Sequence, residues 1–117
     1  MTKERAPKLR TRRSLRVFWT DLALSDLETI GDYIARDNPV AAERWVMKLY
    51  AVAEKAALTP LAGRRVPEVA RDDVHETSLR TYRIVYRVGA DRFEILTIFE
   101  GHRLFPQDLV LPGVKGR

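Results

Sequence analysis

The apolar residues divide the chain into segments with a period of two, typical of strands, and segments with a period near 3.6, typical of helices. A short first strand is predicted where apolar residues alternate with others, at Leu15, Val17 and Trp19. The helical period follows at Ala23, Leu27, Ile30 and Ile34. This stripe predicts an amphipathic helix that Thr20 or Asp21 caps, with Asp26 on its solvent side.

The dipeptide Asn38-Pro39 ends this helix and starts another. The residue before proline is disfavoured in a helix, whereas asparagine is a good N-cap and proline a good first helical residue. A second apolar stripe runs to about Leu58, at Ala42, Trp45, Val46, Leu49, Ala53 and Ala56. The short connection predicts an antiparallel helical hairpin, and residues 59–68 read as loop.

From Val74 the period returns to two and predicts three strands, over 74–79, 82–88 and 92–99. The turn at 89–91 makes the last two a β-hairpin. In its first arm Tyr82, Ile84, Tyr86 and Val88 share one face, and Arg83, Val85 and Arg87 share the other. One face therefore suits a core, and the arginine-bearing face suits a partner.

The order β-α-α-β-β-β predicts an α+β fold, with the N-terminal helical hairpin packed on one face of an antiparallel sheet. Two helices cover a single face, so the face with Arg83 and Arg87 is expected to be open. The domain is expected to span 15–105. A basic, disordered tail is expected over 1–14, and an irregular tail over 106–117. Leu104, Phe105, Leu109 and Leu111 are candidates to dock near that end.

The length of 117 residues fits one domain. The chain has no cysteine, which excludes disulfides and thiolate sites, and no apolar run long enough to span a membrane. The N-terminal end lacks the apolar core of a secretion signal. No metal-ligand cluster, phosphate-binding loop or Ser/His/Asp set is present, so no cofactor is expected.

The positive charge is concentrated in residues 1–16, which hold seven basic residues against one acidic residue, a net charge of +6. The whole chain carries +5, so the remainder is close to neutral at −1. A solvated extension and an arm that contacts DNA or RNA both fit this segment.

Four motifs in order across residues 15–105 resemble the RelE/ParE superfamily of bacterial toxins. They are Asp37-Asn38-Pro39 with Ala41-Ala42-Glu43-Arg44, Pro60-Leu61-Ala62-Gly63-Arg64 with Val66-Pro67-Glu68, Tyr82-Arg83-Ile84-Val85-Tyr86-Arg87, and Phe99-Glu100-Gly101-His102-Arg103. The chain looks most like the ParE branch of type II toxin–antitoxin systems. That resemblance implies a cytoplasmic protein that poisons DNA gyrase. It also implies neutralisation by a cognate antitoxin, with a toxin dimer within a heterotetramer.

The RelE branch instead contains ribosome-dependent mRNA endonucleases, and its motif positions match Glu68, Arg83 and His102. A base, a guanidinium and an imidazole acid are adequate for ribose-assisted cleavage. However, Arg103 stands where those nucleases end in an aromatic residue, and their lysine cluster is missing. The resemblance therefore favours a non-enzymatic inhibitor. A degenerate toxin that only binds antitoxin is a further alternative.

The residues expected to bind the target or partner are Arg80, Arg83, Arg87, His102 and Arg103. Each also has a structural interpretation. Arg83 and Arg87 can pair across the sheet with Glu76 or Glu94. Glu68 can pair with one of the nearby arginines Arg64, Arg65 and Arg71, and His102 can form a hydrogen bond at the end of its strand. Trp19 and Trp45 are expected in the core.

Overall fold

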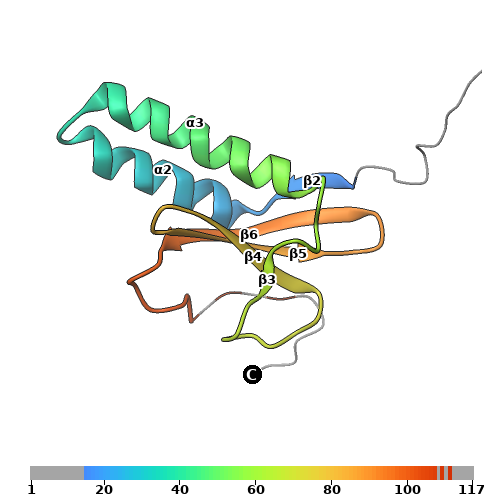
Figure 1. The fold of residues 1–117 in the computed structure, drawn as a ribbon. Helices are drawn as coiled ribbons and strands as arrows, with labels where there is room; N and C mark the ends of the chain where they lie inside the picture. Colours follow the sequence, from blue (N-terminus) through green and yellow to red (C-terminus); the bar gives the residue numbers. More distant parts are fainter. Residues whose placement is uncertain (1–14, 108, 110, 112–117) are drawn as a thin grey trace, which may run out of the picture.

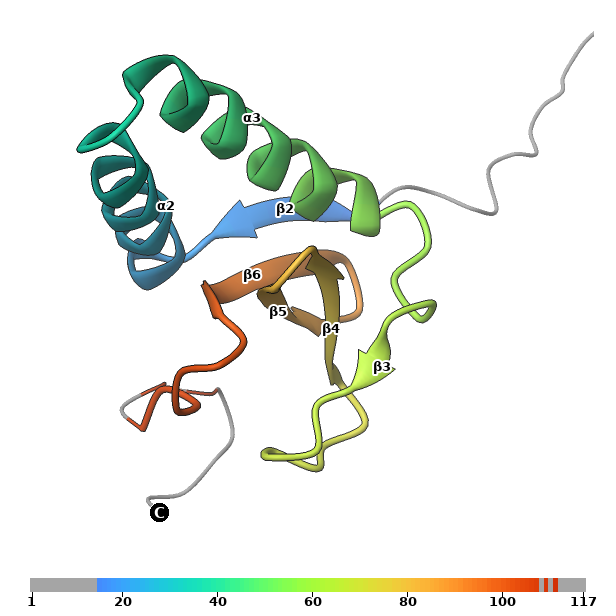
Figure 2. The ribbon, with the colours of Figure 1, turned by 60° about the vertical axis from the view of Figure 1, so that its left-hand side comes forward.

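The computed structural model describes residues 15–107, 109 and 111. Five strands form one sheet in the order β2-β6-β5-β4-β3. The helices α2 and α3 lie together on one side of that sheet (Figure 1). Figure 2, turned by 60°, shows the same two layers. The predicted α+β architecture is confirmed.

Both helices begin at the predicted caps. Helix α2 spans Asp21–Ala35, and the Thr20 hydroxyl accepts a hydrogen bond from the backbone N–H of Ala23. Helix α3 spans Pro39–Ala56, and the side chain of Asn38 accepts from the N–H of Ala41. These bonds satisfy backbone donors that have no partner within the helix.

Strands β4 (Val74–Leu79), β5 (Tyr82–Val88) and β6 (Arg92–Glu100) pair antiparallel, as predicted. Strand β2 (Arg16–Trp19) instead runs parallel to β6, which makes the sheet mixed. Two helices separate β2 from the later strands, so the chain can enter those strands from either end of the sheet. The order of the elements therefore does not determine whether β2 runs parallel or antiparallel to β6. The expected loop at 64–68 contains a two-residue strand, β3 (Arg64–Arg65), paired antiparallel with β4.

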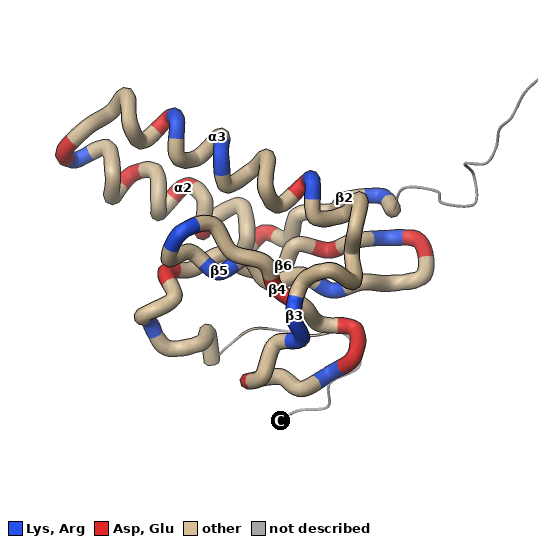
Figure 3. Tube along the Cα trace, in the orientation of Figure 1, with Lys and Arg blue, Asp and Glu red and all other residues tan. Residues whose placement is uncertain are grey.

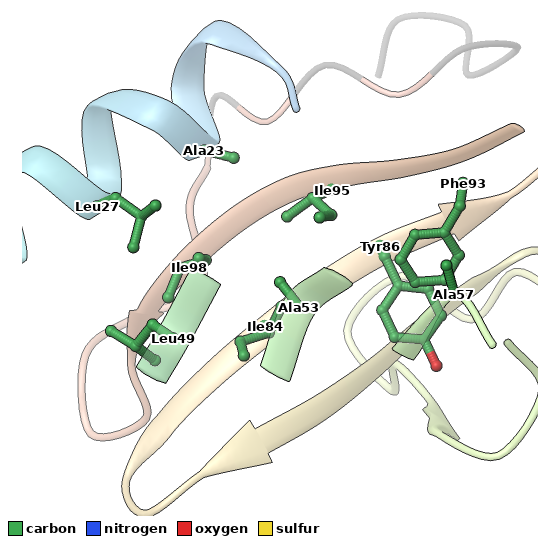
Figure 4. Packing of buried hydrophobic residues seen from close by; sticks show 10 residues of the cluster. All are labelled: Ala23, Leu27, Leu49, Ala53, Ala57, Ile84, Tyr86, Phe93, Ile95 and Ile98. Atoms are coloured by element: carbon green, nitrogen blue, oxygen red, sulfur yellow. The ribbon is translucent and has the colours of Figure 1, made fainter. Parts of the chain in front are cut away.

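The main core fills the space between the helices and the sheet. Figure 4 shows residues of α2 and α3, among them Leu27 and Leu49, together with residues of β5 and β6. The stacked rings of Tyr86 and Phe93 have centroids 4.4 Å apart. The fully or nearly fully buried members are Ala23, Leu27, Leu49, Ala53, Ala57, Ile84, Tyr86, Phe93, Ile95 and Ile98. Trp19 packs against this cluster. Trp45 is half-buried and lies outside it, against the ring of Tyr82.

The opposite face of the sheet is not open, and that prediction is wrong. A second cluster covers it, built from Val66, Val74, Val85, Leu96 and Phe99, with Val69, Phe105, Leu109 and Leu111 packed against it. The cover comes from the loop after β3 and from the segment after β6. Neighbouring strands place apolar residues beside Val85 on this face, so exposing it to water would be unfavourable. Of the four residues expected to dock, only Leu104 is exposed.

Candidate functional site

Arg83 lies under this cover and is held by two carboxylates. Its two terminal nitrogens donate to the two oxygens of Glu68, each at 2.9 Å, and its Nε donates to Glu76 at 2.7 Å. The guanidinium carbon also lies 5.1 Å from the ring centre of Phe99 and 5.7 Å from that of Phe105. The side chain is 16% exposed. The open arginine face expected from the sequence is therefore not found at Arg83, whose guanidinium is paired within the protein.

Glu76 is the buried centre of this ion-pair network. It is 5% exposed, and its second oxygen accepts a hydrogen bond from Nε of Arg64 at 2.5 Å. A buried carboxylate is unfavourable unless it is paired and hydrogen-bonded. Arg83 thus forms the pair with Glu76 that was considered for it from the sequence. Glu68 pairs with Arg83 rather than with its neighbours in sequence.

These contacts keep both members of the Arg83–Glu68 pair charged. Hydrogen bonds from Arg83 lower the pKa of Glu68 to about 2, while partial burial opposes that change. The bond to Glu68 likewise raises the pKa of Arg83 above its ordinary value. A carboxylate with so low a pKa is a weak proton acceptor near neutral pH.

Arg87 is also paired, near the opposite end of β5. Its Nε donates to Glu94 at 2.8 Å, across the strands, and a terminal nitrogen lies 3.6 Å from Asp73. The bond to Glu94 raises the pKa of Arg87. The predicted cross-strand pair is confirmed, and the side chain of Arg87 is 18% exposed.

Arg80, His102 and Arg103 lie at the other end of the sheet and are exposed. The turn after β4 and the turn after β6 meet there, because the N–H of Gly101 donates to the carbonyl of Thr81 at 2.6 Å. Arg80 has a positive φ of 58°, and its guanidinium carbon is 5.9 Å from the ring centre of Trp45. The structure thus brings three of the five predicted residues to one end of the sheet.

His102 is 82% exposed, and its Nδ1 lies 2.8 Å from a carboxylate oxygen of Glu100. The backbone N–H of His102 donates to the other oxygen of Glu100 at 2.8 Å. This is the structural hydrogen bond considered for a histidine at the end of its strand. No hydrogen bond or ion pair links His102 to Glu68 or Arg83 within the described part of the chain, although those two residues lie together.

A groove of about 760 Å³ runs between α2 and the second half of β6, a feature that the sequence reasoning missed. Strand β2 ends opposite Ile95, so the rest of β6 has no strand neighbour on that side within the described residues. The groove is lined by apolar and polar groups, among them Leu22, Asp26, Tyr33, Tyr82, Ile98 and Arg103. The mismatch between a first strand of four residues and a last strand of nine could have indicated it.

Asp26 forms part of the groove wall, and its placement on the solvent side of α2 was wrong. Its carboxylate accepts from the hydroxyl of Thr97 at 2.5 Å and from the N–H of Ile98 at 2.9 Å. Burial raises the pKa of Asp26, and these two bonds partly oppose that change. The side chain therefore ties α2 to a part of β6 that β2 does not reach.

Across residues 15–107, 109 and 111, no group of three or more histidine, cysteine, aspartate or glutamate side chains is arranged to hold a metal ion. None of the helices among those residues is long and apolar enough to cross a membrane.

The sequence profile described as "ParE toxin of type II toxin-antitoxin system, parDE" matches residues 17–105. Protein Y4kP of Sinorhizobium fredii is 35% identical over 99 residues, which is 80% of this chain and 96% of that protein. Toxin RelE2 of Caulobacter vibrioides is 35% identical over 88 residues, 75% of this chain and 97% of that toxin. Among solved structures, the chromosomal ParDE toxin–antitoxin system of P. aeruginosa is similar with a TM-score of 0.63 and 22% identity. The match covers 74% of this chain and 96% of that one.

Proposed function

This chain belongs to the ParE toxin family of type II toxin–antitoxin systems, and we propose that it inhibits growth by binding and poisoning DNA gyrase in the cytoplasm. In this proposal a cognate antitoxin neutralises it. The target comes from the family resemblance, whereas the mode of action, binding without catalysis, draws support from the arrangement of side chains.

The observation that carries the proposal is the engagement of Arg83. A ribonuclease that uses this guanidinium needs its N–H groups for the phosphate. Here the Nε and both terminal nitrogens donate to Glu68 and Glu76. The pKa of Glu68, at about 2, makes it a weak general base. His102, the third member of the nuclease set, bonds to Glu100 instead. These contacts favour a structural role for the set.

Arg80, His102 and Arg103 supply the exposed cationic surface that we assign to target binding. They share one end of the sheet, where the turns after β4 and β6 meet. Arg83 and Arg87 stabilise the sheet behind this surface through their ion pairs. This assignment revises the five-residue surface expected from the sequence.

We place part of the antitoxin in the groove beside β6. Its volume of about 760 Å³ accommodates several side chains, and its lining combines apolar residues with the carboxylates of Asp26 and Glu100 and the guanidinium of Arg103. A segment with apolar side chains and polar groups of matching charge would complement it. The similarity of this fold to a solved ParDE toxin–antitoxin system supports an antitoxin partner in general.

An in vitro supercoiling reaction tests the proposed target. Purified toxin added to gyrase and relaxed plasmid is expected to block supercoiling or trap cleaved DNA. Arg80→Ala with Arg103→Ala should weaken inhibition at least tenfold, whereas Arg36→Ala, at an exposed site at the end of α2, should not change it. Unchanged supercoiling at a large excess of toxin would overturn the gyrase assignment.

A relative named RelE2 keeps the ribosome-dependent endonuclease as a second candidate. It predicts mRNA cleavage on ribosomes that is lost in Arg83→Ala and in His102→Ala. Cleavage with that dependence would replace our proposal. Harmless induction in a host without antitoxin, with both assays negative, would instead identify a degenerate toxin that only binds antitoxin.

A further inference from the structure

Strand β6 is paired along only part of one side. Strand β2 runs beside residues 92–95, and residues 96–100 have no strand partner on that side within the described part of the chain. The sequence of residues 93–99 is Phe-Glu-Ile-Leu-Thr-Ile-Phe, with a single charge and no proline or glycine. A free strand edge of this composition pairs readily with a strand of another molecule. This half of β6 therefore needs protection from such pairing.

Asp26 supplies a partner at the centre of the free edge. The N–H of Ile98 donates to the Asp26 carboxylate at 2.9 Å, so Ile98 turns its N–H away from β5 and toward α2. The hydroxyl of Thr97, which is almost fully buried, donates to the same carboxylate oxygen at 2.5 Å. An incoming strand would have to displace the carboxylate to reach this N–H, and the Thr97 hydroxyl would then lose its acceptor.

Backbone groups on either side of Ile98 are engaged as well. The hydroxyl of Thr20 lies 2.9 Å from the carbonyl oxygen of Leu96. Residues two apart in a strand turn their backbone groups to the same side, so Glu100 belongs to the edge of Ile98. The Glu100 carbonyl accepts from the N–H of Arg103 at 3.0 Å. Figure 3 shows acidic and basic positions following each other where the chain leaves β6, and charged side chains at a strand edge also discourage pairing.

A bulge interrupts the same stretch of β6. Along β5, Val85 pairs with Thr97. The next residue, Tyr86, pairs with Ile95, so Leu96 has no residue opposite it. Bulges bend and twist a strand, and native proteins use them to keep edges from pairing with other molecules. The bulge, the engaged backbone groups and the charged end of the strand all oppose the addition of a further strand.

We propose that Asp26 prevents the free edge of β6 from pairing with β6 of a second copy of this chain. The edge is the same in both copies, so two of them can pair antiparallel about a two-fold axis. With that axis at Ile98, each copy's N–H would meet the other copy's carbonyl in place of the Asp26 carboxylate. Such pairing would also obstruct the groove beside β6. The proposal does not rest on gyrase being the target.

Sedimentation velocity of the full-length chain tests this proposal between about 5 and about 200 µM, where exposed strand edges associate. Asp26→Leu removes the acceptor and should self-associate roughly tenfold more strongly than the unaltered chain, as expected for about one net hydrogen bond. Asp26→Asn keeps a side-chain oxygen that accepts from Ile98, so it should behave as the unaltered chain does.

Gly63→Ala separates edge pairing from a general loss of stability. A β-carbon at Gly63 would meet the backbone carbonyl of Glu76 in β4, which β5 separates from β6. This variant should therefore lose stability without gaining self-association. Circular dichroism shows whether each variant is folded, and Asp26→Ala makes the same comparison if the larger side chain of Asp26→Leu prevents folding.

Amide hydrogen exchange identifies the surface that associates. In Asp26→Leu at low concentration, the amide of Ile98 should exchange faster than in the unaltered chain, because it has lost its acceptor. As dimers form, the amides of Ile98 and Glu100 should become protected.

The proposal is overturned if folded Asp26→Leu and Asp26→Ala associate no more than the unaltered chain, or if Gly63→Ala associates as strongly as they do. It is also overturned if association leaves the amides of Ile98 and Glu100 unprotected, since another surface would then form the contact. Inhibition of gyrase is measured separately, so that a failure of the proposed function is distinguished from a failure of this one.

Discussion

Glu68 shows how one contact decides between a chemical and a structural role. A carboxylate in a loop beside an arginine and near a histidine matches a nuclease set in sequence. In the structure that carboxylate binds the arginine through two hydrogen bonds of 2.9 Å. The same residue types that could cleave RNA therefore stabilise each other. Sequence alone could not separate these outcomes, because the loop conformation decides which arginine Glu68 reaches.

The depressed pKa of Glu68 predicts a pH dependence of stability. A group whose pKa is lower in the folded state stabilises the fold above its unfolded pKa and loses that contribution as the pH falls through the folded value. For Glu68 the loss runs from about pH 4.5 to about pH 2. Glu68→Gln should cost about 1 kcal/mol at pH 7, because more than a third of the side chain is exposed and solvent screens the pair.

Urea unfolding across that pH range measures the effect. The difference between Glu68→Gln and the unaltered protein should shrink toward pH 2. Asp32→Asn, at an exposed position of α2, is the control and should leave the pH profile unchanged. A constant difference from pH 7 to pH 2 would contradict the lowered pKa.

Gly63 is a second residue whose role is local. A β-carbon at this position would meet the hydroxyl of Tyr86 and the backbone carbonyl of Glu76. The carbonyl cannot move without disturbing β4, and the Tyr86 hydroxyl donates to Pro60 at 3.0 Å. Gly63→Ala should therefore reduce the free energy of unfolding by about 2–3 kcal/mol.

Gly89→Ala is the matched substitution in the turn before β6, where the nearest atom to an added β-carbon is the Arg92 carbonyl oxygen at 3.3 Å. Gly89→Ala should lower the free energy of unfolding by under about 1 kcal/mol. Thermal unfolding of both variants compares the two positions. Equal losses of stability in the two variants would show that the close contacts at Gly63 do not make a β-carbon unfavourable there.

At the scale of elements, local signals predicted most of the structure. The cap at Asn38-Pro39 and the change of period at Val74 place α3 and β4 where they are observed. The direction of β2 and the pairing of β3 were not predictable in this way. Strand β2 pairs with β6, which is distant in sequence, and β3 borders β4 for only two residues, too few to give an alternating pattern.

Thr20 connects two elements, so its loss should cost more than the loss of a simple cap. Its oxygen accepts from the N–H of Ala23 at 3.1 Å. Its single hydroxyl hydrogen donates to the carbonyl of Ile95 or of Leu96, at 3.0 and 2.9 Å. Thr20→Ala should cost about 2 kcal/mol, since a cap and a bond to β6 are lost together.

Asn38→Ala removes a cap alone, with one bond of 3.0 Å to Ala41, and should cost about 1 kcal/mol. Thr20→Ser keeps the hydroxyl and should stay close to the unaltered protein. Urea midpoints of the three variants give the ranking. A loss for Thr20→Ala no larger than for Asn38→Ala would mean that the bond to β6 contributes nothing.

At the scale of the whole molecule, the covered second face changes where function is placed. Alternation along β5 correctly divided its residues between two faces, with Ile84 and Tyr86 in the main core and Val85 in the second cluster. What covers the second face could not be predicted, because it depends on how the loop after β3 and the segment after β6 fold back. The arginines on that face, Arg83 and Arg87, form ion pairs within the protein.

The segment after β6 should stabilise this arrangement chiefly through Phe105. Its ring meets Phe99 edge to face with centroids 5.6 Å apart, and the Arg83 guanidinium lies over it. Phe105→Ala should lower the free energy of unfolding by about 2 kcal/mol, below the range for a fully buried phenylalanine. Leu104→Ala, at a neighbouring side chain that is 87% exposed, should change it by less than about 0.5 kcal/mol.

Both variants also distinguish a structural cover from a binding surface. If the covered face is structural, Phe105→Ala at a temperature where it is folded should inhibit gyrase as strongly per molecule as the unaltered protein. The urea midpoint and the supercoiling assay are then expected to disagree, with stability reduced and inhibition kept. Reduced inhibition by the fully folded variant would place the second face, and Arg83 with it, back at the target interface.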